Sequence, residues 1–105
     1  MQTYNKDAYG YKIYADFGED VSASTAFTMT IIPQEGEEIA VTPTIETSDV
    51  TVGDQTYTGN EVVSYTVESG KFDDYAGRYR FMATALVGTE MKVTPWQEFR
   101  IRRGA

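Results

Sequence analysis

The sequence predicts an all-β fold, an antiparallel β-sandwich of about seven strands. Short runs of alternating apolar and polar residues recur along the chain, turn-forming residues separate them, and no stretch convincingly indicates a helix. A length of 105 residues fits one domain, so we expect a single unit over residues 1–105, with residues 1–8 as an N-terminal arm. A small barrel is the alternative. The expected strands cover residues 9–17, 25–32, 39–46, 50–58, 61–67, 77–87 and 91–102.

The first two runs alternate apolar and polar residues regularly, whereas the third is interrupted by a proline. In residues 9–17 one face is expected to hold Tyr9, Tyr11, Ile13, Ala15 and Phe17. In residues 25–32 the apolar face is expected to hold Phe27, Met29 and Ile31. Pro33 ends that run, and a polar turn follows it. Residues 39–46 contain Pro43, which cannot donate a ladder hydrogen bond, so this run is expected at a sheet edge or a bulge.

The middle of the chain carries two close turn signals. Gly53 and Asp54 lie between two β-rich arms of residues 50–58, which is typical of a hairpin. A second turn at Gly59 and Asn60 precedes the strand expected over residues 61–67.

The last two runs are the longest. One face of residues 77–87 is expected to hold Tyr79, Phe81, Ala83, Ala85 and Val87. A turn at Gly88 and Thr89 leads into the final run, where Pro95 predicts a break or a sheet edge.

The segment DDYAGRYRF, residues 73–81, is typical of a tyrosine corner. In this motif a tyrosine near the start of the penultimate strand hydrogen-bonds to backbone a few residues upstream. Phe81 occupies the place of a cysteine in disulfide-linked immunoglobulin domains, and we expect it to meet one of three residues across the core: Phe27, Met29 or Ile31. The corner predicts an immunoglobulin-like sandwich. Its expected residues are Asp74 (or Asp73) for the turn amides, Gly77 for close backbone approach, Tyr79 and Phe81.

Composition disfavours several classes of function. The net charge of −7 and the pI of about 4.4 oppose binding to a nucleic-acid backbone. The chain has no cysteine, which excludes disulfides and favours an intracellular or virion protein over a secreted one. No apolar run is long enough for a membrane span or a signal peptide, so we expect no membrane association.

Reactive chemistry is not expected. Histidine and cysteine are absent and the serines lack a nucleophile-elbow context, so we predict that the chain is not an enzyme and carries no cofactor or metal. Paired acids would suit a glycosidase, but in the turns of a small sandwich they are more often solvated. Calcium bound between loops at one end of the sandwich is the alternative. The pairs are Glu19-Asp20, Glu37-Glu38 and Asp73-Asp74.

A protein-binding face is the more plausible site. Strand parity directs several residues outward, Trp96 follows a proline break, and the C-terminal end is basic in an otherwise acidic chain. Tyrosine, tryptophan, methionine and arginine are enriched at interfaces, although aromatic side chains also stack on sugars. The candidate interface residues are Tyr14, Met82, Leu86, Trp96, Arg100, Arg102 and Arg103.

Two longer segments carry a resemblance to a known group of proteins. YGYKIYADFGEDVSASTAFTMTIIPQEG and VVSYTVESGKFDDYAGRYRFMA resemble small virion proteins of tailed bacteriophages, including the N-terminal module of upper baseplate proteins, over residues 9–102. The resemblance implies a non-enzymatic immunoglobulin-like module in the virion. It would dock on other virion proteins. Because the chain is short and carries no long assembly arm or coiled coil, we slightly favour head decoration over the neck, tail or baseplate. Symmetric association of copies is a further hypothesis. The alternative is a carbohydrate- or cell-surface-binding adhesion module.

Overall fold

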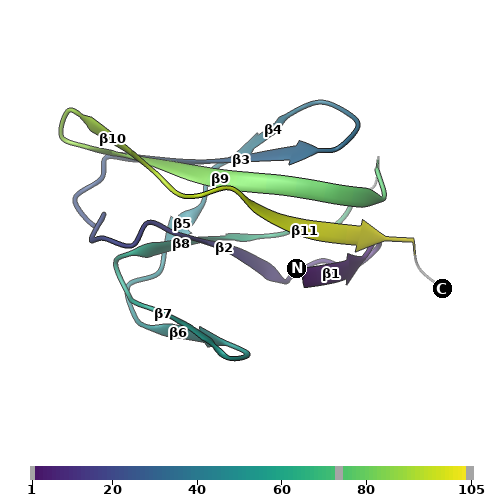
Figure 1. The fold of residues 1–105 in the computed structure, drawn as a ribbon, viewed down its shortest axis with the longest axis horizontal. Coiled ribbons are helices and arrows are strands. Elements are labelled where there is room, and N and C mark those ends of the chain that lie inside the picture. The colour runs from purple at the N-terminus through teal and green to yellow at the C-terminus, as the bar shows by residue number, and fades with distance from the viewer. Residues whose placement is uncertain (1, 73–74, 104–105) are drawn as a thin grey trace.

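The computed structural model describes residues 2–72 and 75–103, which form eleven strands and no helix (Figure 1). The all-β class expected from the sequence is therefore confirmed. No segment of this described part is a helix that would cross a membrane. The strands are β1 (Gln2–Asn5), β2 (Lys12–Asp16), β3 (Ala26–Pro33), β4 (Ile39–Val41), β5 (Thr44–Ile45), β6 (Val50–Val52), β7 (Gln55–Tyr57), β8 (Val62–Thr66), β9 (Gly77–Val87), β10 (Glu90–Val93) and β11 (Gln97–Arg102).

The strands form a large sheet, a small sheet and a separate hairpin. The large sheet has the order β1-β11-β9-β3-β4, and β10 pairs with the second half of β9. The small sheet has the order β2-β8-β5, and β6 pairs only with β7. All pairs are antiparallel except β1 with β11, which run parallel.

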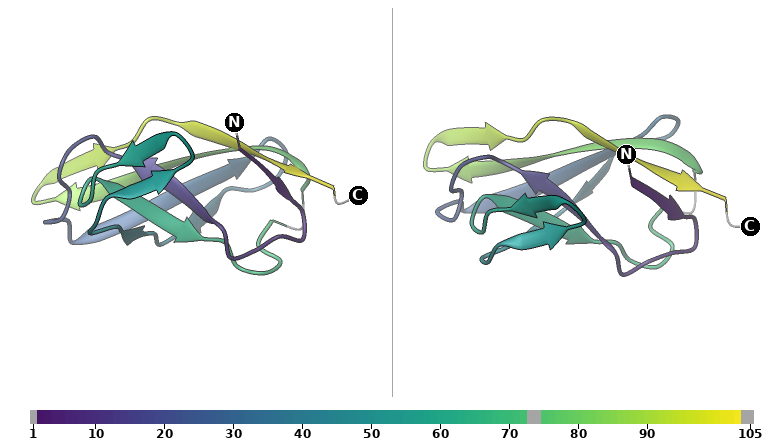
Figure 2. Two further views of the ribbon diagram at one scale, coloured as in Figure 1. Left: turned by 90° about the horizontal axis from the view of Figure 1, so that it is seen from below. Right: turned by 60° about the horizontal axis from the view of Figure 1, so that its bottom comes forward.

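The two sheets face each other and bury one apolar core between them (Figures 1 and 2). Alternation along each strand places every second side chain in this core. The large sheet contributes aromatic and aliphatic residues from β3, β9 and β11, and the small sheet contributes residues from β2 and β8. The buried members are Ile13, Ala15, Met29, Ile31, Val63, Tyr65, Val67, Phe72, Tyr79, Phe81, Ala83, Phe99 and Ile101.

The β6–β7 hairpin adds a third layer below the small sheet (Figure 1). Val62 and Ser64 point away from the main core by strand parity, yet they are only 0% and 4% exposed. The ring of Tyr57 on the hairpin stacks on Tyr14 of β2, with centroids 5.4 Å apart. Strand β8 is therefore covered on both faces, which explains its nearly continuous run of buried residues.

The structure has more strands than the seven expected. Pro43 separates β4 from β5, where the chain passes from the large to the small sheet. Both are edge strands of their sheets, so the expected edge position is confirmed and no bulge forms within one strand. Pro95 divides the last run into β10 and β11, as its position predicted. Residues 2–5 of the expected arm form β1 and pair with β11.

Two expected side-chain positions were wrong. Phe81 meets none of Phe27, Met29 and Ile31 across the core. All three lie on β3, the neighbour of β9 in the same sheet, and Ile31 is the register partner of Phe81. Tyr9 lies in the loop before β2 and is 66% exposed, whereas Ile13 and Ala15 of the same run are buried.

Thr94 continues the pairing with β9 across the proline break. Its backbone N–H donates to the carbonyl oxygen of Ala83 (3.0 Å), and its hydroxyl oxygen accepts from the Ala83 N–H (3.0 Å). The hydroxyl oxygen of Thr94 thus accepts the hydrogen bond from Ala83 that a backbone carbonyl would accept in a regular ladder. Trp96, two residues later, stands outside the ladder and is 47% exposed.

Tyr79 is buried at the start of β9, and its hydroxyl lies near backbone upstream of the strand. The hydroxyl donates to the carbonyl oxygen of Tyr75 at 2.6 Å, and the carbonyl oxygen of Phe72 is 3.4 Å away. Gly77 has φ of +151°, a backbone conformation that residues with a side chain rarely adopt, so this position favours glycine. Asp73 and Asp74, expected to cap the turn, lie outside the described residues.

Replacing Tyr79 with phenylalanine is expected to lower the free energy of unfolding by about 1 kcal/mol or slightly more. The ring would still fill the core, but the partly buried carbonyl of Tyr75 would lose its donor. Urea denaturation of both proteins measures the difference. Tyr9→Phe is the matched control, since that hydroxyl is on an exposed side chain, and an equal effect of both substitutions would contradict a structural role for the bond.

Candidate protein-binding surface

The outer face of the large sheet is the surface that does not contact the core. Strand β9 directs Tyr79 and Phe81 inward, so the residues between and around them point outward. Strand β11 alternates in the same way, with Phe99 and Ile101 buried. The outward residues of these two strands include Arg78, Arg80, Met82, Leu86, Glu98, Arg100 and Arg102.

One part of this face, the arginine half, consists of Arg78, Arg80, Arg100 and Arg102. Arg78 lies directly opposite Arg100 in the β9–β11 ladder, and Arg80 lies opposite Glu98. Glu98 is the one acidic residue in these two strands. Four of the nine basic residues of an acidic chain are thus gathered on two neighbouring strands.

The arginines form no ion pair within the described part of the chain. Its ion pairs use lysines instead: Lys12 with Glu46 at 3.0 Å, and Lys92 with Glu19 at 3.1 Å and Glu90 at 2.7 Å. Arg102 donates to the side-chain oxygen of Asn5 at 2.8 Å, which is a neutral partner. The positive charge of the arginine half is therefore not neutralised by contact with a described carboxylate.

The other part of the outer face is apolar. Met91 and Val93 of β10 pair with Leu86 and Thr84, so they point outward on the same side as Leu86. They are 59% and 57% exposed. We define the apolar half as Met82, Leu86, Met91, Val93 and Trp96.

Trp96 connects the two halves. The guanidinium carbon of Arg80 lies 4.8 Å from the centroid of its ring, which is a cation–π contact. The contact places the Arg80 side chain beside an exposed indole. Aromatic and basic groups consequently meet at one point of the surface.

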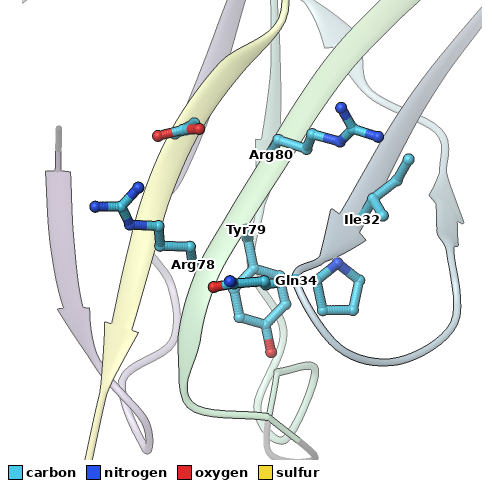
Figure 3. A pocket seen from close by; sticks show the side chains of 7 residues that line it. Ile32, Gln34, Arg78, Tyr79 and Arg80 are labelled. Carbon is cyan, nitrogen blue, oxygen red and sulfur yellow. The ribbon is translucent and has the colours of Figure 1, made fainter.

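A hollow of about 360 Å³ lies within the arginine half (Figure 3). Figure 3 shows Arg78 directed toward β11 and Arg80 toward Ile32 of β3, with Gln34 between them in front of Tyr79. The hollow is open to solvent and combines guanidinium groups, an amide and apolar atoms. Its lining residues are Ile32, Pro33, Gln34, Arg78, Tyr79, Arg80 and Glu98.

The structure brings most of the expected interface residues onto the outer face. Met82, Leu86, Trp96, Arg100 and Arg102 lie there, and Arg103 follows β11 as an exposed residue.

Tyr14 does not join them, because it lies on the small sheet and stacks against Tyr57 of the hairpin. Sequence reasoning missed Arg78 and Arg80. The alternation in RYRF was visible, but only the register with β11 shows that these arginines lie beside Arg100.

The acidic loops do not build a metal centre within the described residues. No group of three acidic side chains there is arranged to hold a metal ion. Glu35, Glu37 and Glu38 line a different hollow, at the end of the sandwich, together with Lys71. The Asp73-Asp74 pair of the calcium hypothesis lies outside the described residues.

A small network of polar side chains lies on the outer side of the small sheet. Glu46 accepts hydrogen bonds from the hydroxyl of Ser64 (2.6 Å) and from Lys12 (3.0 Å). The bond from Ser64 is the main cause that holds the pKa of Glu46 below its usual range. Within the described residues this carboxylate is thus engaged by two partners, Ser64 and Lys12.

Alkaline pH is expected to destabilise the fold. Burial raises the pKa of Tyr11 to about 12, with Tyr4 stacked 3.8 Å from it, and burial also raises the pKa of Tyr4, Tyr57 and Tyr65. Above about pH 10 these tyrosines ionise in the unfolded chain but keep their protons in the folded one, so the free energy of unfolding falls as pH rises.

Urea denaturation at several pH values, with tyrosinate absorbance, measures this fall. Tyr11→Phe is expected to make the fall less steep, because it removes a phenol whose pKa burial raises to about 12. A free energy of unfolding that stays constant from about pH 10 to pH 12 would contradict the expectation.

The geometry of the surface bears on the function of the chain, whereas comparison with known proteins does not. The geometry shows an exposed face that joins apolar and basic groups on a rigid sheet. Searches found no match to this chain among protein-family models, curated proteins or solved structures.

Proposed function

We propose that the chain is a non-enzymatic structural component of a tailed-phage virion, an immunoglobulin-like module that docks on other virion proteins. The observation that carries the proposal is the outer face of the large sheet. Three large hydrophobic residues are strongly exposed there, Met91, Val93 and Trp96, and they adjoin the arginine half. Contiguous apolar surface rimmed by polar residues marks interaction sites, and tryptophan, methionine and arginine are enriched in them.

Strand order supports the immunoglobulin-like part of the proposal. In such sandwiches the third, sixth and seventh framework strands share one sheet, and the second, fourth and fifth share the other. Here β3, β9 and β11 share the large sheet, and β2, β5 and β8 form the small one. The hairpin β6–β7 is then an insertion between the fourth and fifth framework strands. The first strand differs, since β1 pairs with β11 instead of β2.

The docking mode follows from the two halves of the outer face. The apolar half would supply the part of an interface that is buried away from water, and the arginines would set orientation at its rim. Because the face belongs to regular strands, it needs little ordering on binding, which lowers the entropic cost of association. We place the module on the head shell as decoration, with neck, tail and baseplate as the locations to be compared.

Sedimentation of a lysate from cells infected by the encoding phage tests the proposal. The chain is expected to travel with megadalton particles, and separation of heads from tails then identifies its location. The variant M91D/V93D is expected to stay near the top of the gradient, because it places carboxylates on the apolar half. Val52→Asp is the matched control, since Val52 is exposed on the hairpin, away from the large sheet.

Other distributions contradict the proposal. If the unmodified chain remains a small species in the gradient, it is not a virion component. Glycan binding by that species, lost in Trp96→Ala, would instead support the adhesion module, for which Trp96 is the exposed aromatic candidate. If M91D/V93D and the unmodified chain sediment alike with particles, docking uses another surface.

A further inference from the structure

We propose that the arginine half binds the carboxylates of an acidic segment of a partner protein, with Arg78 and Arg80 as the main contacts. The inference rests on the proposed function, because it names the chemistry of the partner for the same face. It concerns the hollow of about 360 Å³ between these arginines rather than the apolar half.

The first argument is an unfavourable pairing that the isolated fold does not relieve. Arg78 and Arg100 are direct cross-strand neighbours on the outward side of β9 and β11. Like charges in this position destabilise a sheet. Within the described residues no carboxylate lies within ion-pair distance of either arginine. A bound acidic segment would remove this repulsion, which no carboxylate of residues 2–72 and 75–103 relieves by an ion pair.

The second argument is the geometry of the hollow. Arg78 and Arg80 extend to opposite sides of it, and Gln34 lies between them (Figure 3). A guanidinium group binds a carboxylate through two parallel N–H···O bonds. The ring of Trp96 contacts Arg80 as a cation–π partner, so the N–H groups at the edge of the guanidinium remain available. One extended segment in the hollow can therefore direct one carboxylate toward Arg78 and another, on its opposite side, toward Arg80.

The third argument distinguishes a protein segment from larger polyanions. Gln34 is followed by the exposed residues Glu35, Glu37 and Glu38, so acidic side chains border this end of the face. A nucleic-acid backbone or an anionic membrane extends well beyond the hollow and would meet those carboxylates. A short acidic segment in the hollow meets Glu98 as the one acidic residue of its lining, and the net charge of −7 disfavours the broader contact.

Binding of a short, fluorescently labelled polyglutamate peptide at low salt tests the inference on the full chain. R78E/R80E is expected to bind at least about tenfold more weakly than the unmodified chain, since charge-assisted hydrogen bonds are lost. K6E/K71E changes the net charge equally and is expected to bind as the unmodified chain does, because neither lysine lies on β9 or β11. R78K/R80K is expected to bind with intermediate affinity, because lysine lacks the bidentate fork.

Measurements on the same variants can also contradict the inference. Equal binding by R78E/R80E and K6E/K71E overturns the inference. A second contrary result is that the unmodified chain binds single-stranded DNA or phosphatidylserine vesicles more tightly than the peptide. If R78E/R80E loses that tighter binding, the arginines serve another partner. Self-association that R78E/R80E abolishes assigns them to a second copy of the chain.

Folding and the proposed function are tested separately. Arg78 and Arg80 are exposed. Glutamate at position 78 relieves the repulsion with Arg100, whereas glutamate at position 80 faces Glu98, so R78E/R80E is expected to melt close to the unmodified chain. If it does melt lower, R78Q/R80Q takes its place in the peptide assay. A chain that sediments with particles but fails to bind the peptide retains the proposed function and loses this inference.

Discussion

Replacing Phe99 with alanine is expected to lower the free energy of unfolding by about 3–5 kcal/mol, the largest loss among the substitutions considered. Phe99 is 1% exposed on β11 and lies at the centre of an aromatic cluster. Its ring is stacked on Tyr79 with centroids 5.1 Å apart, and it also contacts Phe72 at 5.4 Å, Phe81 at 5.7 Å and Tyr4 at 6.1 Å.

The size of the loss follows from what these rings connect. They come from β1, β9 and the loop before β9, so one cavity at Phe99 would weaken several contacts at once. Domains of this size are stable by only about 5–15 kcal/mol, so the variant would be close to unfolding.

Urea denaturation followed by far-ultraviolet circular dichroism measures this loss. Phe99→Leu, which keeps most of the apolar volume, is the control and is expected to cost clearly less. A loss below about 1 kcal/mol for Phe99→Ala would show that the aromatic cluster does not hold the core together.

Replacing Gly59 with alanine is expected to cost about 1–3 kcal/mol by forcing the base of the hairpin apart. A Cβ at this position would lie 2.8 Å from the carbonyl oxygen of Thr47 and 2.9 Å from backbone atoms of Ser48. These are backbone atoms, so no side-chain rotation relieves the overlap. The N–H of Gly59 also donates to Asp49 at 2.8 Å, which ties both ends of the hairpin insertion together.

Gly59→Ala is expected to affect more than the turn, because the hairpin covers the outer side of β8. Val62 and Ser64 would gain exposure if it moved. Hydrogen exchange of β8 amides, compared with thermal unfolding, measures both effects. Thr58→Ala is the control, since this neighbouring side chain is exposed and is expected to change stability by less than about 0.5 kcal/mol. Equal effects of the two substitutions would contradict the close approach.

Local sequence patterns predicted the individual strands well. Alternation from Gly77 to Val87 predicted β9 with its bounds, Pro95 predicted the break in the last run, and Gly53 with Asp54 predicted the β6–β7 hairpin. These features depend on residues close in sequence, whose spacing of two selects strand faces and whose turn residues select backbone angles.

The proline at position 43 was harder to interpret, because a bulge, an edge strand and a change of sheet all tolerate a missing N–H. The structure shows a change of sheet there. Residues 2–5 were expected as an arm, and their pairing with β11 depends on a segment nearly the whole chain away. An alternation pattern over a few residues does not identify a partner strand so far away in the sequence.

Composition and the spacing of residues along a strand are enough to predict the all-β class, the alternating faces and the acidic charge. Only the tertiary structure decided that Arg78 stands beside Arg100, that Tyr14 is covered by Tyr57, and that the hairpin shields β8. These relations depend on register and on the stacking of layers. Both are selected by how the whole core packs rather than by any local run of residues.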